Sequence, residues 1–257
     1  MKGTLYFVLL SMLITGCSKY QTPITKRTQM MLLSKADELH IGKKDFKQIL
    51  KNCKLSKDQE KIDMINRVSK KLINVVKDHH YLWEFVLVEN KKINASCLPG
   101  GKIIISTGLF KVIKNETQLA AVLAHEMSHA IARHGNSRMS RAQVMNGFEV
   151  AGTVAVGLIN PLMIVPFILG YEAGTKHGVV LPKSRLEEHE ADVIGLNIMN
   201  KAGYDMKEAV VLMHNIKDVN KHKRNLKNST HLTYDKRIHE LEKSINEIKN
   251  KEKDRIN

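Results

Sequence analysis

The first half of the chain shows a helical pattern followed by a β-rich one. Apolar residues recur at helical spacing between lysines over residues 30–78, which predicts two helices with Leu55-Ser56 as the cap before the second. Residues 82–89 and 102–107 are rich in β-branched and aromatic residues, and they flank a stretch with a turn at residues 99–101. The pattern therefore predicts a helical pair and then a small hairpin or meander.

Helical periodicity resumes at Asn115, which we expect to be an N-cap, with Gln118 at the third helical position and Gly135 as the C-terminal stop. Two more helices are predicted over residues 184–200 and 206–221. The fold class is therefore α+β and mostly α. Near the C-terminus an apolar stripe between lysines indicates a helix docked on the core, formed by Ile238, Leu241, Ile245 and Ile248.

The N-terminus has the features of an export signal. Lys2 precedes an apolar run, residues 5–14, that is too short to span a bilayer comfortably. Ile14-Thr15-Gly16-Cys17 then resembles a bacterial lipobox, in which cleavage precedes the cysteine and the cysteine receives lipid. The alternative is an ordinary N-terminal anchor with an incidental cysteine. The lipobox interpretation divides the chain into a signal peptide (1–16), a lipidated polar tether (17–29) and a folded domain (30–257).

Charge and cysteine content constrain the surroundings of the protein. The formal net charge is +15 and the pI is near 9.6, so we expect an acidic partner surface. An exported protein has no access to cytoplasmic nucleic acid, which leaves lipid headgroups or envelope polymers. If Cys17 carries lipid, Cys53 and Cys97 remain, either as a disulfide or as two small buried residues.

The strongest chemical signal is the stretch AHEMSHAIARH, residues 124–134. His125 and His129 lie four positions apart, so on a helix they share a face and can direct imidazole nitrogens at one metal ion. Glu126 can take the proton from a water whose pKa the ion has lowered, as that water attacks a peptide carbonyl. This arrangement is typical of zinc hydrolases.

A catalytic zinc ion needs a third protein ligand and one open position. The segment SRLEEHEADVIG offers Glu187, Glu188 and Glu190, and only Glu188 has an acid four residues later, at Asp192. We therefore expect Glu188 to bind the ion and Asp192 to accept a hydrogen bond from a ligating histidine. Gly195 lies on the same face and predicts close packing against another helix. The alternative is that these acids form a solvated surface.

Residues 150–171 carry no charge and are long enough to span a membrane. A single crossing, however, would put His129 and Glu188 in different compartments, unable to share one ion. Pro161 and Pro166 would also interrupt a continuous helix. We therefore predict a helical hairpin, and we favour burial with partial lipid contact over complete burial.

These motifs, in this order, resemble those of the membrane-associated gluzincin zinc metallopeptidases, a family that includes HtpX, the prenyl-protein endopeptidases, and the envelope proteases BepA and LoiP. The lipoprotein signal makes the chain most similar to LoiP-type lipoprotein metalloproteases. The resemblance implies a zincin-like domain with a small β-sheet beside the active-site helix. It runs from about Ser34 to Leu241 and includes SKADELHIG, NASCLPGGKIIISTGL, LAAVLAHEMSHAIARHG, SRLEEHEADVIGL, KAGYD and STHLTYDKRI.

The resemblance also implies one zinc ion per chain and a role for each matching residue. The roles on the two helices are metal ligation by His125, His129 and Glu188, general-base catalysis by Glu126, and support of the ligands by Asp192. A β-strand is expected to receive an extended polypeptide substrate by β-augmentation, at Asn94, Ala95 and Ser96.

Two positions depart from the family pattern. Ser96 stands where an aromatic residue is usual, so the substrate preference of relatives does not carry over to this chain. Leu232 replaces the proline that usually follows His231. The loop containing His231 can approach the metal in relatives, and His231 is predicted either to act there, by stabilising the oxyanion or plugging the site, or to be structural.

The combined prediction is a lipid-anchored zinc endopeptidase of the bacterial cell envelope. The resemblance alone supplies its substrates, misfolded or misassembled membrane and envelope proteins. Ser18 and Lys19 lack the aspartate that retains some lipoproteins in the inner membrane, which favours the outer membrane, facing the periplasm. The alternative is an envelope assembly factor or chaperone with a gated or structural zinc site. Ser96 and a His231 plug support this alternative, whereas the intact Glu126 favours the enzyme.

Overall fold

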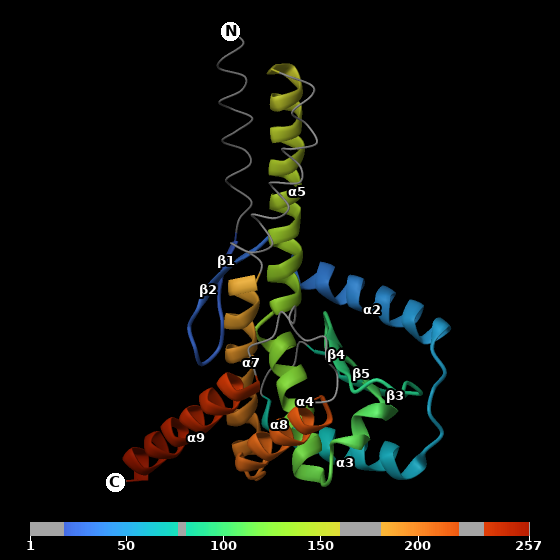
Figure 1. The fold of residues 1–257 in the computed structure, drawn as a ribbon, viewed down its shortest axis with the longest axis vertical. Helices are drawn as coiled ribbons and strands as arrows, with labels where there is room; N and C mark the ends of the chain where they lie inside the picture. Colours follow the sequence, from blue (N-terminus) through green and yellow to red (C-terminus); the bar gives the residue numbers. More distant parts are fainter. Residues whose placement is uncertain (1–17, 77–80, 160–180, 221–233, 257) are drawn as a thin grey trace.

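The computed structural model describes residues 18–76, 81–159, 181–220 and 234–256, and its fold is α+β and mostly α, as predicted (Figure 1). The elements in chain order are β1 (Ser18–Gln21), β2 (Thr28–Met31), α2 (Lys35–Asn52), α3 (Gln59–Val75), β3 (Glu84–Val88), β4 (Ala95–Leu98), β5 (Lys102–Ser106), the short 3-10 helix η1 (Thr107–Lys111), α4 (Glu116–Ile131), α5 (His134–Ile159), α7 (Leu181–Lys201), α8 (Lys207–Asn220) and α9 (Tyr234–Ile256).

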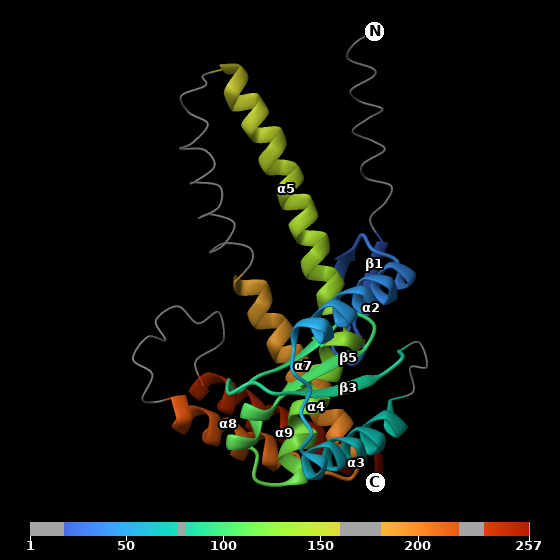
Figure 2. The same ribbon diagram turned by 90° about the vertical axis from the view of Figure 1, so that its right-hand side faces the viewer.

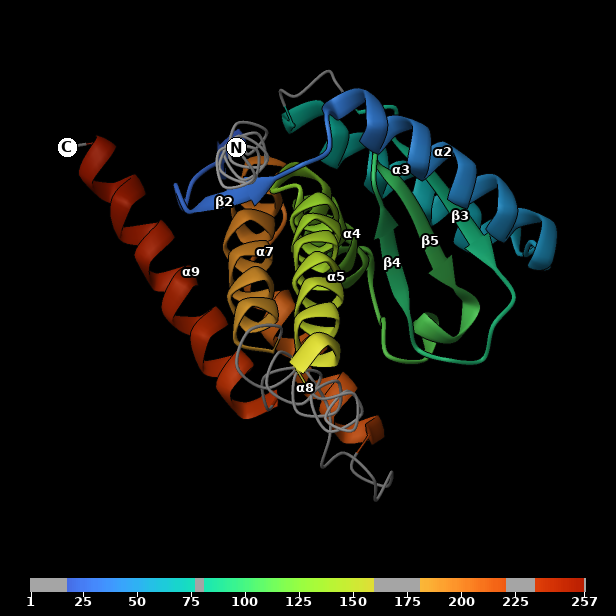
Figure 3. The ribbon, with the colours of Figure 1, turned by 90° about the horizontal axis from the view of Figure 1, so that it is seen from above.

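Helix α4 occupies the centre of the domain. Seen from above, the sheet lies on one side of α4 and α7 lies on the other, with α9 packed outside α7 (Figure 3). Helices α3 and α8 also contact α4. Leu119, Leu123 and Met127 of α4 are consequently fully buried. A helix surrounded in this way holds its side chains in fixed rotamers, which suits it to carry a chemical site.

The sheet has the strand order β3–β5–β4. Strand β5 is completely buried, and it pairs in parallel with β3 and antiparallel with β4. A hairpin with its turn at residues 99–101 is present, but it joins β4 to β5, whereas the two segments predicted to be β-rich, residues 82–89 and 102–107, pair in parallel. Gly100 and Gly101 in its turn have φ angles of 79° and 84°, left-handed values that favour glycine. The predicted meander is wrong, because β3 joins the far side of β5 in parallel.

The predicted helices are present, but two of their boundaries differ. The cap of α3 is Asp58, which accepts from the Lys61 backbone N–H, because Leu55 instead pairs with Val88 as a β-bridge. Asn115 caps α4 through the Gln118 N–H, as predicted. The predicted apolar stripe of α9 is buried at all four positions, Ile238, Leu241, Ile245 and Ile248.

The C-terminal stop of α4 was misplaced at Gly135. Helix α4 ends at Ile131, and Gly135 lies inside α5. The left-handed residue at the junction is Arg133, with φ 55°. Arg133 is held there because its guanidinium donates to Glu38 at 2.8 Å and to the Leu33 carbonyl at 3.2 Å. Tertiary contacts of Arg133 therefore stabilise the left-handed conformation that was expected at a glycine.

Residues 18–29 are not a free tether. They form most of an antiparallel hairpin, β1–β2, which docks on the end of α4. The Tyr20 hydroxyl donates to the Ile131 carbonyl at 3.0 Å, and the Gln29 amide donates to the Ala132 carbonyl. Tyr20 and Gln29 therefore hold the hairpin against the end of α4, while Lys19, Gln21 and Lys26 stay exposed to solvent. The predicted signal peptide and Cys17 lie outside the described residues.

The first part of the uncharged run belongs to α5, which continues as one helix to Ile159 and projects away from the sheet (Figure 2). Residues 160–171, where the predicted hairpin turns, lie outside the described residues. Among the residues that are described, no helix combines the length and the apolar character needed to cross a membrane.

Candidate metal centre

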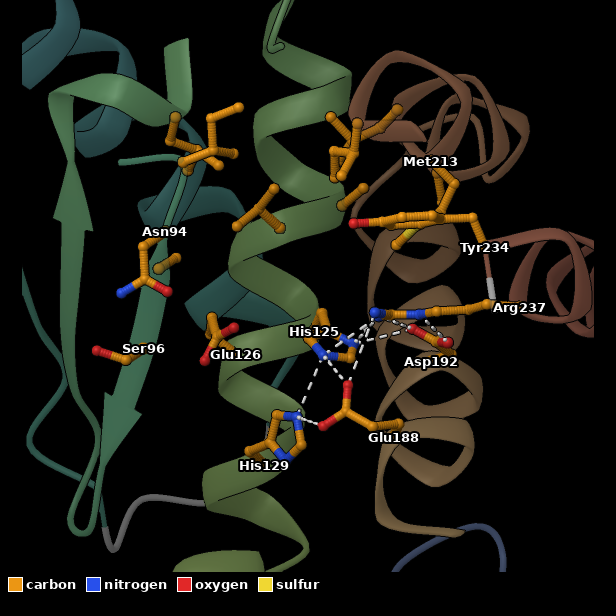
Figure 4. A pocket seen from close by; sticks show the side chains of 18 of the residues that line it. Asn94, Ser96, His125, Glu126, His129, Glu188, Asp192, Met213, Tyr234 and Arg237 are labelled. Atoms are coloured by element: carbon orange, nitrogen blue, oxygen red, sulfur yellow. Dashed lines mark hydrogen bonds and ion pairs between the residues drawn. The ribbon is translucent and has the colours of Figure 1, made fainter. Parts of the chain in front are cut away.

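Helices α4 and α7 bring the three predicted ligands together. His125 and His129 lie one turn apart on the face of α4 that meets α7, and Glu188 faces them from α7 (Figure 4). The helices approach closely because Gly195 has no side chain: a Cβ there would lie 3.2 Å from the His125 backbone nitrogen. The acids on this face are buried, Glu188 and Asp192 being 8% exposed each, so they do not form a solvated surface.

The separations between the ligand atoms suit one tetrahedral ion. His125 Nε2 lies 3.1 Å from His129 Nε2, and the two Glu188 oxygens lie 3.5 Å from one imidazole nitrogen each. Zinc–ligand bonds at tetrahedral angles place neighbouring ligand atoms about 3.3 Å apart. Two imidazoles and one carboxylate are also a donor set of catalytic zinc sites. The residues present therefore fit a zinc ion with one open coordination position.

The neighbouring acids of the segment have other partners. Glu187 pairs with Arg141 at 2.6 Å, and Glu190 turns toward the β1–β2 hairpin, where Arg27 lies 2.6 Å away. Of the three glutamates offered by the sequence, only Glu188 faces the histidines. The choice made from the position of Asp192 thus agrees with the geometry.

Asp192 holds the outer nitrogen of His125. His125 Nδ1 donates to Asp192 Oδ1 at 2.9 Å, and Arg237 donates to both Asp192 oxygens at 2.8 Å. Burial opposes ionisation of Asp192, but Arg237 and the hydrogen bond from His125 hold the pKa of this carboxyl well below its usual range. An ionised Asp192 fixes the tautomer of His125 that leaves Nε2 free to bind a metal.

Arg237 was not predicted as a site residue, although its sequence position carries a signal. Arg237 lies four residues before Leu241, so it shares the buried stripe of α9. An arginine on such a stripe requires a buried acid as its partner. The sequence gives no indication that this acid would be Asp192.

The carboxyl groups of Glu188 and Glu126 have pKa values that are shifted in opposite directions. Burial opposes ionisation of Glu188, but His125 and His129 hold its pKa well below its usual range. Burial raises the pKa of Glu126 to about 7, and the Glu188 charge acts in the same direction. Glu188 is therefore a permanent anion suited to bind a cation, whereas Glu126 can take up and release a proton near neutral pH.

Glu126 faces the strand predicted to hold substrate. It lies on the side of α4 that meets β4, whereas Glu188 of α7 faces the other side of α4 (Figure 4). Asn94, Ala95 and Ser96 line the same cavity as Glu126, a cleft of about 860 Å³. Strand β4 is at the edge of the three-stranded sheet, and an edge strand can pair with an extended peptide.

Two predicted sites fall outside the described residues. His231, predicted near the metal, and Cys17, predicted to carry lipid, are among the residues not described.

Cys53 and Cys97 are both free thiols, Cys53 exposed and Cys97 half-buried, so they do not form a disulfide.

Comparison with known proteins places this site in a family. The profile of Peptidase family M48 matches residues 56–245, which include α4, α7 and the start of α9. The chain belongs to peptidase family M48. Peptidases of this family depend on a metal ion, in keeping with the cluster of His125, His129 and Glu188.

This M48 chain is similar to bacterial and mitochondrial proteases. The Beta-barrel assembly-enhancing protease of Escherichia coli (strain K12) is 28% identical over 176 residues, or 67% of this chain and 36% of that protein. The Mitochondrial metalloendopeptidase OMA1 of Schizosaccharomyces pombe is 34% identical over 148 residues, 58% of this chain and 42% of the relative. OMA1 of Saccharomyces cerevisiae is 28% identical over 227 residues, which are 78% of this chain and 61% of that protein. The chain thus spans about a third of the length of the Escherichia coli relative.

Replacing Asp192 by Asn leaves the side-chain volume nearly unchanged but removes the charge that holds His125 and Arg237. We expect zinc affinity to fall by about 10- to 100-fold, measured by competition with a chromophoric chelator. Asp63→Asn, at an exposed position on α3, is the matched control and should bind zinc like the wild type. Unchanged affinity in Asp192→Asn would contradict the supporting role of Asp192.

Proposed function

We propose that this M48 peptidase is a zinc-dependent endopeptidase of the bacterial cell envelope, lipid-anchored, that degrades misfolded or misassembled membrane and envelope proteins. The observation that carries the proposal is the placement of Glu126 between the ligand cluster and the edge strand β4 (Figure 4). A structural metal site needs ligands but no neighbouring general base and no strand to hold a peptide.

His125, His129 and Glu188 would hold one zinc ion per chain, which supplies a Lewis acid and lowers the pKa of water when bound. The protein groups perform the remaining work. Glu126 accepts a proton from the attacking water and returns it to the leaving amine of the peptide. Asp192 and Arg237 keep His125 in one tautomer while charge moves. His231 is proposed to stabilise the developing oxyanion or to plug the site.

The substrates are proposed to be unfolded polypeptides, because β4 can pair only with a chain whose backbone is extended. Backbone hydrogen bonds along an edge strand read no particular side chains. Ser96, small and half-buried, adds little side-chain recognition of its own. A site built in this way acts on segments that have lost or not yet gained their structure, which supports a quality-control role.

Glu126→Gln removes the proposed base while preserving the ligands. We expect the purified variant to bind zinc like the wild type but to cleave casein about 10²- to 10⁴-fold more slowly. Glu247→Gln, at an exposed position on α9, should cleave normally. Zinc in both the wild type and Glu126→Gln with equal cleavage rates would rule out Glu126 as the base, and a wild type that binds no zinc would overturn the proposed site.

A second candidate function is an envelope assembly factor or chaperone in which proteolysis is rare or gated. Ser96, in place of the usual aromatic residue of the strand, favours it, and one relative is named for enhancing β-barrel assembly. The same Glu126→Gln variant separates the two functions in cells that lack the native copy. Full complementation by the variant would support the assembly factor, and loss of complementation would support the peptidase.

The proposed envelope location rests on the N-terminal sequence and on the net charge of +15, which suits a surface of anionic headgroups. We expect the full-length protein expressed in bacteria to incorporate labelled palmitate at Cys17. Cys17→Ala should abolish the label, and Cys53→Ala, which removes an exposed free thiol, should retain it. Equal labelling of the wild type and Cys17→Ala would disprove lipidation at this cysteine.

The cleft beyond the ligands is apolar, and this character constrains the proposed cleavage preference. Apolar side chains from η1, α4 and α8 line it, namely Leu109, Ala121, Val122, Leu212, Met213 and Ile216. Figure 4 shows Met213 across the cleft from Asn94. A pocket of this kind accommodates a bulky apolar side chain of the substrate next to the scissile bond.

Val122 lies one turn before Glu126 on the same face of α4, so Val122→Phe should fill this pocket. For this variant, we expect kcat/KM for peptides with Leu or Phe next to the scissile bond to fall about tenfold or more, relative to kcat/KM for peptides with Ala at that position. Val211→Phe adds the same group at a position of α8 that is 42% exposed and should leave the preference unchanged. An unaltered preference in Val122→Phe would show that substrate side chains bind elsewhere.

A further inference from the structure

The second histidine of the cluster, His129, is also held from behind, by a partner that the sequence analysis did not find. His129 Nδ1 lies 2.8 Å from Nδ1 of His134, the first residue of α5, and the His134 side chain is fully buried. The left-handed turn at Arg133 directs His134 back beneath α4. The two imidazoles meet edge to face, with ring centroids 4.9 Å apart.

His134 is held in turn by Glu190. His134 Nε2 lies 3.0 Å from Glu190 Oε2, and the Glu190 side chain is 3% exposed. The other donors to this carboxylate come from the β1–β2 hairpin. Arg27 Nε donates at 2.8 Å, and the hydroxyls of Thr22 and Thr25 also donate. A continuous series of buried hydrogen bonds therefore joins the hairpin to His129.

The donor and acceptor in each hydrogen bond of this series can be assigned by starting from Glu190. Glu190 accepts from Arg27 and two hydroxyls, so it is an ionised carboxylate that only accepts. His134 must then donate through Nε2–H, which leaves its Nδ1 as an acceptor. His129 consequently donates through Nδ1–H, and its Nε2 carries the lone pair. That nitrogen is the one that faces Glu188 and His125.

We propose that Glu190 and His134 are positioning residues that fix the tautomer and ring orientation of His129, and that the β1–β2 hairpin supports the metal centre through them. This inference rests on the proposed zinc site. It gives His129 the kind of support that Asp192 and Arg237 give His125; α7 contributes an acid to each, and α5 and the hairpin take the place of α9. The segment expected to be a tether is thereby part of the structure that holds the metal.

His134→Leu tests the inference, because leucine fills the space and removes the acceptor. We expect the zinc affinity of the mature chain to fall by about 10- to 100-fold in a chelator competition, with the helical circular dichroism of the metal-free protein retained. Tyr81→Phe is the matched control: it removes a hydroxyl that donates to the Ala130 carbonyl near the end of α4, from outside the hairpin, and keeps the ring packed on Trp83. Tyr81→Phe should bind zinc within about twofold of the wild type.

A separate variant tests whether the β1–β2 hairpin contributes to zinc binding. The double replacement Thr22→Val and Thr25→Val removes two donors to Glu190 and preserves side-chain shape. We expect a weakening of zinc affinity that is smaller than that of His134→Leu but larger than that of Tyr81→Phe. Affinity equal to that of Tyr81→Phe would overturn the contribution of the hairpin.

A measurement on the unaltered protein covers the case in which His134→Leu does not fold. Long-range ¹⁵N–¹H correlation spectra of the histidine rings report which nitrogen carries the proton. We expect the Nε2–H tautomer for His134 in the zinc-loaded protein, and the Nδ1–H tautomer would overturn the inference. A folded His134→Leu that binds zinc like the wild type would overturn it too, whereas a wild type that binds no zinc would instead refute the proposed function.

Discussion

The close contact between α4 and α7 at Gly195 is the constraint on which the rest of the site depends. The two histidines and the glutamate of the candidate metal centre come from helices that are separate in the sequence, and the close approach of the two helix backbones at Gly195 brings their donor atoms within 4.8 Å of one another. The same approach places Asp192 behind His125 and Glu190 behind His134. One packing interface therefore determines both the ligands and the groups that orient them.

Burial of several acids on one helix would be costly unless each had a compensating partner. Glu187 has Arg141, Glu190 has Arg27 and its hydroxyl donors, and Asp192 has Arg237. Glu188 faces two imidazoles, and its contact with Arg237 is longer, 3.6 Å. Imidazoles that ligate a metal are neutral, so a cation between them is the natural balance for this carboxylate. Charge compensation and ligand geometry thus support the same assignment, independently of family membership.

Sequence reasoning succeeded where the interactions are local. The cap at Asn115, the pairing of His125 with His129 and the stripe that begins at Ile238 all depend on residues a few positions apart. It failed where partners are distant. Thr22 and Glu190 are 168 positions apart, and Arg237 and His125 are 112 apart, so no periodicity connects them. His134 is close to His129 in sequence, but its direction depends on a left-handed arginine that Glu38 and Leu33 hold in place.

The docked hairpin changes what a lipid anchor at Cys17 would mean for the enzyme. A free tether over residues 18–29 would let the catalytic domain reach roughly 40 Å from the bilayer, at about 3.3–3.6 Å per extended residue. Because β1 begins at Ser18 and its hairpin is hydrogen-bonded to α4 and Glu190, that reach is lost. With lipid on Cys17, the cleft between Glu126 and β4 would then stay close to the membrane. Edge-strand pairing in such a position would favour unfolded polypeptide segments close to the bilayer, and the apolar side chains that line the cleft would then select the residue next to the scissile bond.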